Sequence, residues 1–182
     1  MTELVIVKRS FEEPVAMADI EARADAVAWC FQQHGVQVLR SYFAIDRRTM
    51  ISLYRAPDAE AVRETQRRAG LPVTSIWTAV VIGNVEVPAV SPPRTMIIVE
   101  REFPDPVTME LVEQTLSREG HCFSIHRADL LASHLARDGG RMVCVFAAPD
   151  AESVRIANRQ IGMPVANAWP ATVHVPDSAI PR

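Results

Sequence analysis

The sequence predicts an α+β fold of two tandem ferredoxin-like repeats, each with the order βαββαβ, packed sheet to sheet as a pseudo-dimer of the dimeric α/β-barrel type. The first observation is that residues 55–73, RAPDAEAVRETQRRAGLPV, return as residues 147–165, AAPDAESVRIANRQIGMPV, with 11 of 19 positions identical. The second is that the offset of 92 residues holds without a gap from Leu4 to Val81. Self-similarity at one fixed spacing indicates that a small domain was duplicated.

The repeats define the expected domain organisation. We expect the first repeat at residues 1–84 and the second at residues 95–176. Residues 85–94 form a proline-rich linker without periodicity, and residues 177–182 form a short tail. A repeat of this length is small but sufficient for a hydrophobic core.

Each repeat opens with a strand and a helix. Residues 4–11 and 96–103 are rich in β-branched side chains, which favour strands. Apolar residues then recur at helical spacing, and we expect one helix of four to five turns in each repeat, with the second interrupted around Glu119-Gly120. These residues are Met17, Ile20, Ala24, Val27 and Phe31 in the first repeat and Met109, Val112, Leu116 and Phe123 in the second.

A hairpin, a second helix and a last strand complete each repeat. Residues 36–45 and 50–56 alternate as two strands around a turn at 46–48, where the second repeat has Asp138-Gly139-Gly140. Asp58 and Asp150 are expected to cap the helix that follows. Gly70 and Gly162 then end this helix in the left-handed conformation, and a strand comes after the next proline.

The faces of the sheets locate a candidate ligand pocket. Two helices cover one face of a four-stranded sheet, so the other face must meet water or a second sheet. We assign to the helix side Leu39, Phe43, Ile51 and Leu53, with Leu131, Leu135, Val143 and Val145. We assign to the other face, where two sheets can enclose a pocket, Arg40, Tyr42, Met50, Ser52 and Tyr54, with Ala132, His134, Met142, Cys144 and Phe146. The pocket-lining residues we select are Arg40, Tyr42, Ser52, Tyr54, Met142 and Phe146.

His134 and Cys144 are the predicted metal ligands. On this assignment they share one sheet face on neighbouring strands, and imidazole and thiolate suit nickel, zinc or copper. Divergence of a partly buried face between the repeats explains the same residues without a metal.

Two further pairs, Cys30 with His34 and Cys122 with His126, have helical i, i+4 spacing. We interpret these as packing residues, because cysteine often serves as a small buried apolar side chain. We therefore expect replacement of Cys30 or Cys122 to leave any metal content unchanged.

Arg9 and Arg101 occupy the same position late in the first strand of each repeat. They could bind an anionic ligand or pair with a carboxylate such as Glu21 or Glu113. We favour the ion pair within the chain.

Composition limits the partners and the compartment. The formal net charge is −3 and no basic run is present, which predicts neither nucleic-acid nor membrane binding. Three cysteines without a CxxC pair fit a reducing compartment, and we expect a cytoplasmic protein. Because the duplication supplies the pairing that a one-copy relative obtains by dimerisation, we expect a monomer or weak homodimer.

Three segments resemble the DUF4242 family of small bacterial domains. They are SYFAID (Ser41–Asp46), LYRAPDAEAVRE (Leu53–Glu64) and RAGLPV (Arg68–Val73), with weaker counterparts in the second repeat. The family includes a protein described as nickel-binding. The resemblance therefore implies binding of a transition metal such as nickel.

The sequence is compatible with two classes of function. No nucleophile motif, phosphate loop, HExxH or paired-cysteine zinc signature is present, which favours a binding protein over a hydrolase or kinase. The first candidate is a metal-binding protein for nickel or zinc. The alternative is a small-molecule-binding protein, or an isomerase or monooxygenase of the dimeric α/β-barrel type.

Overall fold

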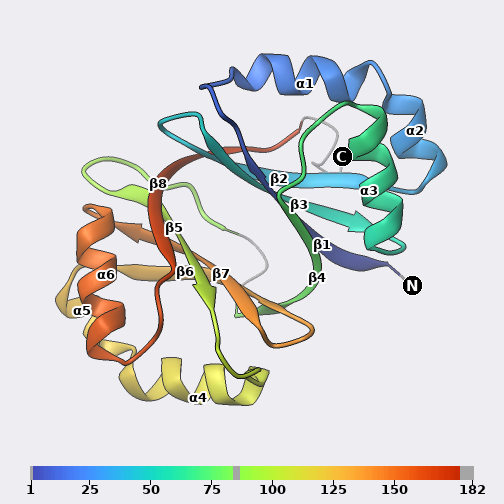
Figure 1. Cartoon of the computed structure of the whole chain (residues 1–182). Coiled ribbons are helices and arrows are strands. Elements are labelled where there is room, and N and C mark those ends of the chain that lie inside the picture. Colours follow the sequence, from blue (N-terminus) through green and yellow to red (C-terminus); the bar gives the residue numbers. More distant parts are fainter. Residues whose placement is uncertain (1, 84–86, 177–182) are drawn as a thin grey trace. The chain divides into compact units, whose positions relative to one another are not determined.

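A computed structural model describes residues 2–83 and 87–176, and its elements follow one order twice (Figure 1). The first repeat contains β1 (Glu3–Ser10), α1 (Met17–Asp25), α2 (Ala28–Gln33), β2 (Gln37–Ala44), β3 (Thr49–Ala56), α3 (Ala59–Arg68) and β4 (Ser75–Ile82). The second contains β5 (Thr95–Glu102), α4 (Met109–Glu119), α5 (His121–Ile125), β6 (Asp129–Ala136), β7 (Arg141–Ala148), α6 (Ala151–Gln160) and β8 (Asn167–His174). The predicted α+β class with two repeats is confirmed.

Strand pairing within each repeat is antiparallel. β3 pairs with β1 and β2, and β1 also pairs with β4, so the order is β4-β1-β3-β2. The second repeat pairs its strands in the same way, in the order β8-β5-β7-β6. This order is the ferredoxin-like one. It makes β1, β3, β5 and β7 strands with a neighbour on each side.

The chain forms two compact units whose limits differ slightly from the sequence repeats. Of the described residues, the first unit contains 2–79 together with 172–176, and the second contains 80–83 and 87–171. The predicted tail at 177–182 lies outside the described residues, as do positions 85 and 86 of the predicted linker.

Each unit has its own core between its sheet and its helices. In the second unit Phe123 of α5 packs on Phe146 of β7, with ring centroids 5.2 Å apart, and Val112 of α4 joins the same cluster. In the first unit Phe31 of α2 packs with Tyr54 of β3, and Ile20 of α1 belongs to a second cluster. The helices therefore cover one face of each sheet.

The predicted ends of the second helices are confirmed. The backbone N–H of Ala61 donates to Asp58 Oδ1 at 2.7 Å, and that of Ser153 donates to Asp150 Oδ1 at 2.7 Å. Gly70 and Gly162 have φ values of 62° and 71°, the left-handed conformation in which glycine is favoured. Short-range signals therefore determined these boundaries.

The prediction of one continuous first helix is wrong for the first repeat, and in the second repeat the helix is interrupted where the sequence indicated, around Glu119-Gly120. The first is divided between α1 and α2, where Val27 leaves the helical conformation with φ −123° and ψ 25°. The second is divided at Gly120 between α4 and α5. Gly120 itself keeps a right-handed helical conformation, with φ −59° and ψ −23°.

None of the helices in the described ranges, 2–83 and 87–176, is long and apolar enough to span a membrane.

Candidate functional site

The structure separates the six residues predicted to line one pocket. Arg40 and Tyr42 of β2 lie opposite Leu53 and Ile51 of β3, on the sheet face away from the helices. Ser52 and Tyr54 of β3, however, face the helices, as do Met142 and Phe146 of β7 in the second unit. The prediction that all six residues share the open sheet face is therefore wrong.

The error arises from strands that are buried on both faces. Residues 50–54 are each at most 3% exposed, so apolar character does not distinguish the two sides of β3. Ile51 and Leu53, which we assigned to the helix side, point away from the helices together with their counterparts Val143 and Val145. A bulge between Val38 and Arg40 also interrupts the alternation of β2, and one between Leu130 and Ala132 does the same in β6.

The predicted metal ligands do not converge. Cys144 lies opposite Ser133 and His134 lies opposite Val143, so His134 and Cys144 project from opposite faces of the sheet. Cys144 is packed in the helix-side core with Phe146 and Phe123. The prediction that one ion contacts both side chains rested on a shared face and is wrong.

A buried arginine network occupies the helix side of the first unit. Arg9 is fully buried and donates to Ser52 Oγ at 3.1 Å, to Tyr54 Oη at 2.8 Å and to Gln66 Oε1. Ser41 Oγ extends the network to Ser52 Oγ at 2.8 Å. All of these acceptors are neutral, and Arg9 makes no ion pair with any carboxylate in the described part of the chain.

The second unit repeats the network with different acceptors. Arg101, which is 1% exposed, donates to Asn158 Oδ1 at 2.6 Å, to the Pro164 carbonyl at 2.7 Å and to Cys144 Sγ at 3.4 Å. Ser133 Oγ donates to the same sulfur at 3.2 Å. Here too no described carboxylate pairs with the guanidinium, so the predicted ion pairs with Glu21 or Glu113 are absent from the described residues.

The geometry of the two arginine networks indicates that they stabilise the fold. Each guanidinium is buried beside the groups that it binds, and it links the first strand to the helix behind it, although Arg9 Nε has no hydrogen-bond partner in the described part of the chain. Sequence reasoning missed Gln66 and Asn158. The available signal was that both positions carry an amide at the same offset, on the buried stripe of the second helix.

Tyr42 is the predicted pocket residue with a perturbed pKa. Burial raises the pKa of its phenol, because the charged phenolate is poorly solvated, and the Arg40 guanidinium acts in the opposite direction. The neutral phenol is therefore the form favoured in the folded chain.

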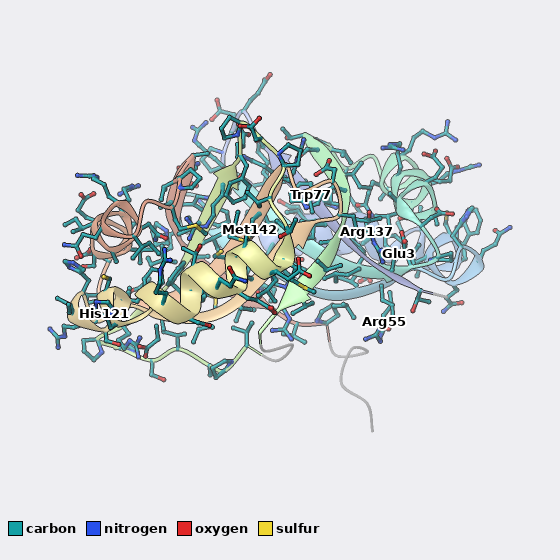
Figure 2. The ribbon with its side chains drawn as sticks, turned by 90° about the horizontal axis from the view of Figure 1, so that it is seen from below. Glu3, Arg55, Trp77, His121, Arg137 and Met142 are labelled. Atoms are coloured by element: carbon teal, nitrogen blue, oxygen red, sulfur yellow. The ribbon has the colours of Figure 1, made fainter. Side chains whose placement is uncertain are left out.

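The two Cys/His pairs on the first helices differ from each other. Cys30 is 1% exposed, as the packing interpretation predicts. Cys122 is only partly buried, and its Sγ lies 3.7 Å from Nε2 of His121, which is exposed at the start of α5 (Figure 2). The other partner, His126, has its Nε2 2.9 Å from Gln160 Oε1.

Among the described residues, no group of three or more His, Cys, Asp or Glu side chains is placed to hold a metal ion. His121 and Cys122 are thus a pair of soft donors rather than a complete site. They are nevertheless the pair that the structure brings together at the surface.

Comparison with known proteins gives a family and a fold. The family model described as "Nickel responsive protein SCO4226-like" matches the chain twice, over residues 5–78 and 98–170. A variant of chlorite dismutase from Candidatus Nitrospira defluvii superposes with a TM-score of 0.53 at 10% identity, covering 95% of this chain and 92% of that one. A second variant of it, in complex with cyanide, gives 0.52 at 10% identity, with 95% and 90% covered. No curated protein matches.

The structural likeness shows the fold class alone, that of the dimeric α/β barrels predicted from the duplication.

Proposed function

We propose, on the premise that this chain belongs to the SCO4226-like family of nickel responsive proteins, that it binds a divalent transition metal through His121 and Cys122. The observation that supports this assignment is the 3.7 Å separation of Nε2 and Sγ at an accessible surface. Nickel is the metal that the family description indicates, and imidazole suits it as a ligand.

The donor pair has the separation that one ion needs. Metal bonds of about 2.3 Å to sulfur and about 2.1 Å to nitrogen allow an ion to contact two atoms that lie less than about 4.4 Å apart. His121 is exposed, so an ion reaches it without opening the core. His134 and Cys144 lack both properties, since they are buried and project from opposite faces.

Two donors make an incomplete coordination sphere. Structural sites usually supply four protein ligands, whereas open sites leave positions for water or another molecule. We therefore expect binding that is readily reversible and that does not hold the fold together. Reversible binding suits a protein that responds to a metal rather than one that stores it.

Titration of metal-free protein with Ni²⁺ tests the proposal, with Zn²⁺ as a second probe. We expect saturable binding that weakens by about tenfold or more in His121→Ala and in Cys122→Ser, because each variant loses one donor. For Cys122 this replaces the expectation from the sequence that its substitution leaves the metal content unchanged, since the structure places Cys122, only partly buried, beside His121. Binding should also weaken as the pH falls, because both donors must be deprotonated to bind the ion. A thiolate-to-nickel absorption band that disappears in Cys122→Ser would identify the sulfur directly.

The matched controls are His134→Ala and Cys144→Ser, which remove the same side-chain types elsewhere in the second unit. These variants should bind Ni²⁺ as the unmodified chain does. The proposal is refuted if the controls lose binding while His121→Ala and Cys122→Ser keep it.

A reducing compartment and a simple oligomeric state complete the proposal. All three cysteines are free thiols, which supports the proposal that the protein resides in the cytoplasm. A monomer or weak homodimer should appear by size-exclusion chromatography with light scattering. A stable tetramer would contradict that expectation.

A further inference from the structure

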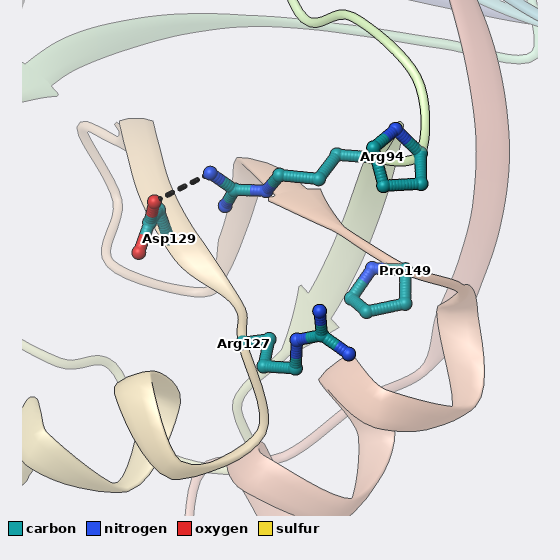
Figure 3. Close-up of a pocket in the computed structure, with 5 residues that line it drawn as sticks. Arg94, Arg127, Asp129 and Pro149 are labelled. Carbon is teal, nitrogen blue, oxygen red and sulfur yellow. Dashed lines mark ion pairs between the residues drawn. The ribbon is translucent and has the colours of Figure 1, made fainter.

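A pocket of about 330 Å³ lies in the second unit, apart from His121 and Cys122 (Figure 3). Two of its residues, Pro93 and Arg94, directly precede β5. Arg127 comes from the turn between α5 and β6, Asp129 begins β6, and Pro149 follows β7. Its volume is at the lower end of the range for small-molecule sites.

One arginine of the pocket is already paired. Arg94 Nη1 lies 2.8 Å from Asp129 Oδ2, and the same guanidinium donates to the Ala147 carbonyl (Figure 3). Its Nε is buried and has no hydrogen-bond partner in the described part of the chain. Asp129 therefore neutralises Arg94 without occupying all of its donors.

The second arginine is available. The Arg127 side chain is exposed and extends toward Pro149, and it makes no hydrogen bond or ion pair with any residue that the structure describes (Figure 3). The three charged residues together give the pocket one net positive charge. Arginine donors match the geometry of carboxylate and phosphate groups, which they bind in a bidentate manner.

The first repeat lacks this arrangement. The residues 92 positions earlier are Met1, Thr2, Gly35, Gln37 and Pro57, none of which has a charged side chain. Pro57 is the counterpart of Pro149, and it lies beside Gly35, the counterpart of Arg127: a Cβ placed on Gly35 would lie 3.7 Å from Pro57 Cγ. The charged groups are thus specific to the second unit, whereas the backbone frame is common to both.

We propose that this pocket binds a small oxyanion, the carboxylate or phosphate group of an organic acid or ester. Arg127 supplies the guanidinium that pairs with the anion, and the partly free donors of Arg94 lie beside it. Pro93 and Pro149 provide an apolar wall for the body of the ligand. The site is independent of the metal donors.

The test is a titration of metal-free protein at constant ionic strength, with sodium benzoate and sodium phosphate as separate probes and sodium chloride as the reference salt. Backbone and arginine Nε–H resonances report binding at Arg94 and Arg127. We expect saturable shifts with one or both probes. A stronger response to benzoate would assign a carboxylate with an apolar body, and a stronger response to phosphate would assign a phosphate ester.

Arg127→Gly is the decisive variant, because it installs the residue of the first repeat. Arg127 has φ 57° and Gly35 has φ 62°, so glycine suits this backbone conformation and the variant should fold. Its affinity should fall by about tenfold or more. Asp129→Asn should instead bind more tightly, because it removes the negative charge.

Arg159→Ala is the matched control, since it deletes an exposed arginine of α6 in the same unit. It should change affinity by less than about twofold. Equal affinity in Arg127→Gly and the unmodified chain would overturn the proposal. Equal weakening in Arg159→Ala would also overturn it, because it would indicate only nonspecific charge attraction. The proposal would likewise be overturned if neither probe showed saturable binding at concentrations up to about 10 mM.

Discussion

Asn158→Ala should destabilise the second unit by about 3 kcal/mol. The Asn158 amide accepts from Arg101 Nη2 at 2.6 Å and donates to the Val154 carbonyl at 2.7 Å, and its side chain is fully buried. A hydrogen bond to a charged group contributes about 1.5–3 kcal/mol and a neutral one about 1 kcal/mol. Alanine also leaves a buried guanidinium N–H without an acceptor, which acts in the same direction.

Urea denaturation followed by circular dichroism measures this change. For a chain of this length, about 3 kcal/mol corresponds to a fall in Tm of roughly 6–12 °C. Gln66→Ala removes the equivalent amide from Arg9 and should have a similar effect in the first unit. Arg159→Ala, at the neighbouring exposed position, should stay within about 0.5 kcal/mol of the unmodified chain.

A double-mutant cycle with Arg101→Met isolates the contact itself. If Asn158 stabilises the fold through Arg101, the two changes should couple by more than about 1 kcal/mol. Additive effects, or a loss below about 1 kcal/mol in Asn158→Ala, would refute the reasoning that a neutral amide compensates the buried charge.

Two further substitutions test the backbone and the buried phenol. Gly139→Ala should lower the free energy of unfolding by about 3 kcal/mol or more, because φ is +71° and the new Cβ would lie 2.5 Å from the Val107 carbonyl oxygen. Gly70→Ala should lower it by only about 1 kcal/mol in the same denaturation assay, since φ is +62° but the space around the new Cβ is open. Because burial raises the pKa of Tyr42, its contribution to stability is present below the unfolded value of about 10 and is lost as the pH rises through the folded pKa. Tyr42→Phe should therefore lose less stability than the unmodified chain between about pH 8 and pH 11, and an unchanged alkaline loss would contradict this assignment.

Repetition and local signals determined the architecture of this protein. The fixed offset identified two copies of one domain, and the alternation of strand and helix patterns gave the βαββαβ order that the structure shows. Asp58, Asp150, Gly70 and Gly162 were assigned correctly, because capping and helix termination depend on a few neighbouring residues. The interruption of the second long helix around Glu119-Gly120 was also predicted, whereas the break at Val27 in the first repeat was not.

The tertiary structure alone decided which side chains meet. β3 and β7 are buried on both faces, so the hydrophobicity of their residues does not indicate which side chains face the helices. For this reason the sequence pattern led us to predict His134 and Cys144 on one face, whereas they project from opposite faces of the sheet. The partners of Arg101 come from β7, from α6 and from the loop after it, positions that lie up to 63 residues away. Likewise Arg94 and Arg127 reach one pocket only because the strand that follows each of them belongs to the same sheet. Contacts of this kind depend on strand register and on the packing of helices over the sheet, which periodicity in the sequence does not specify.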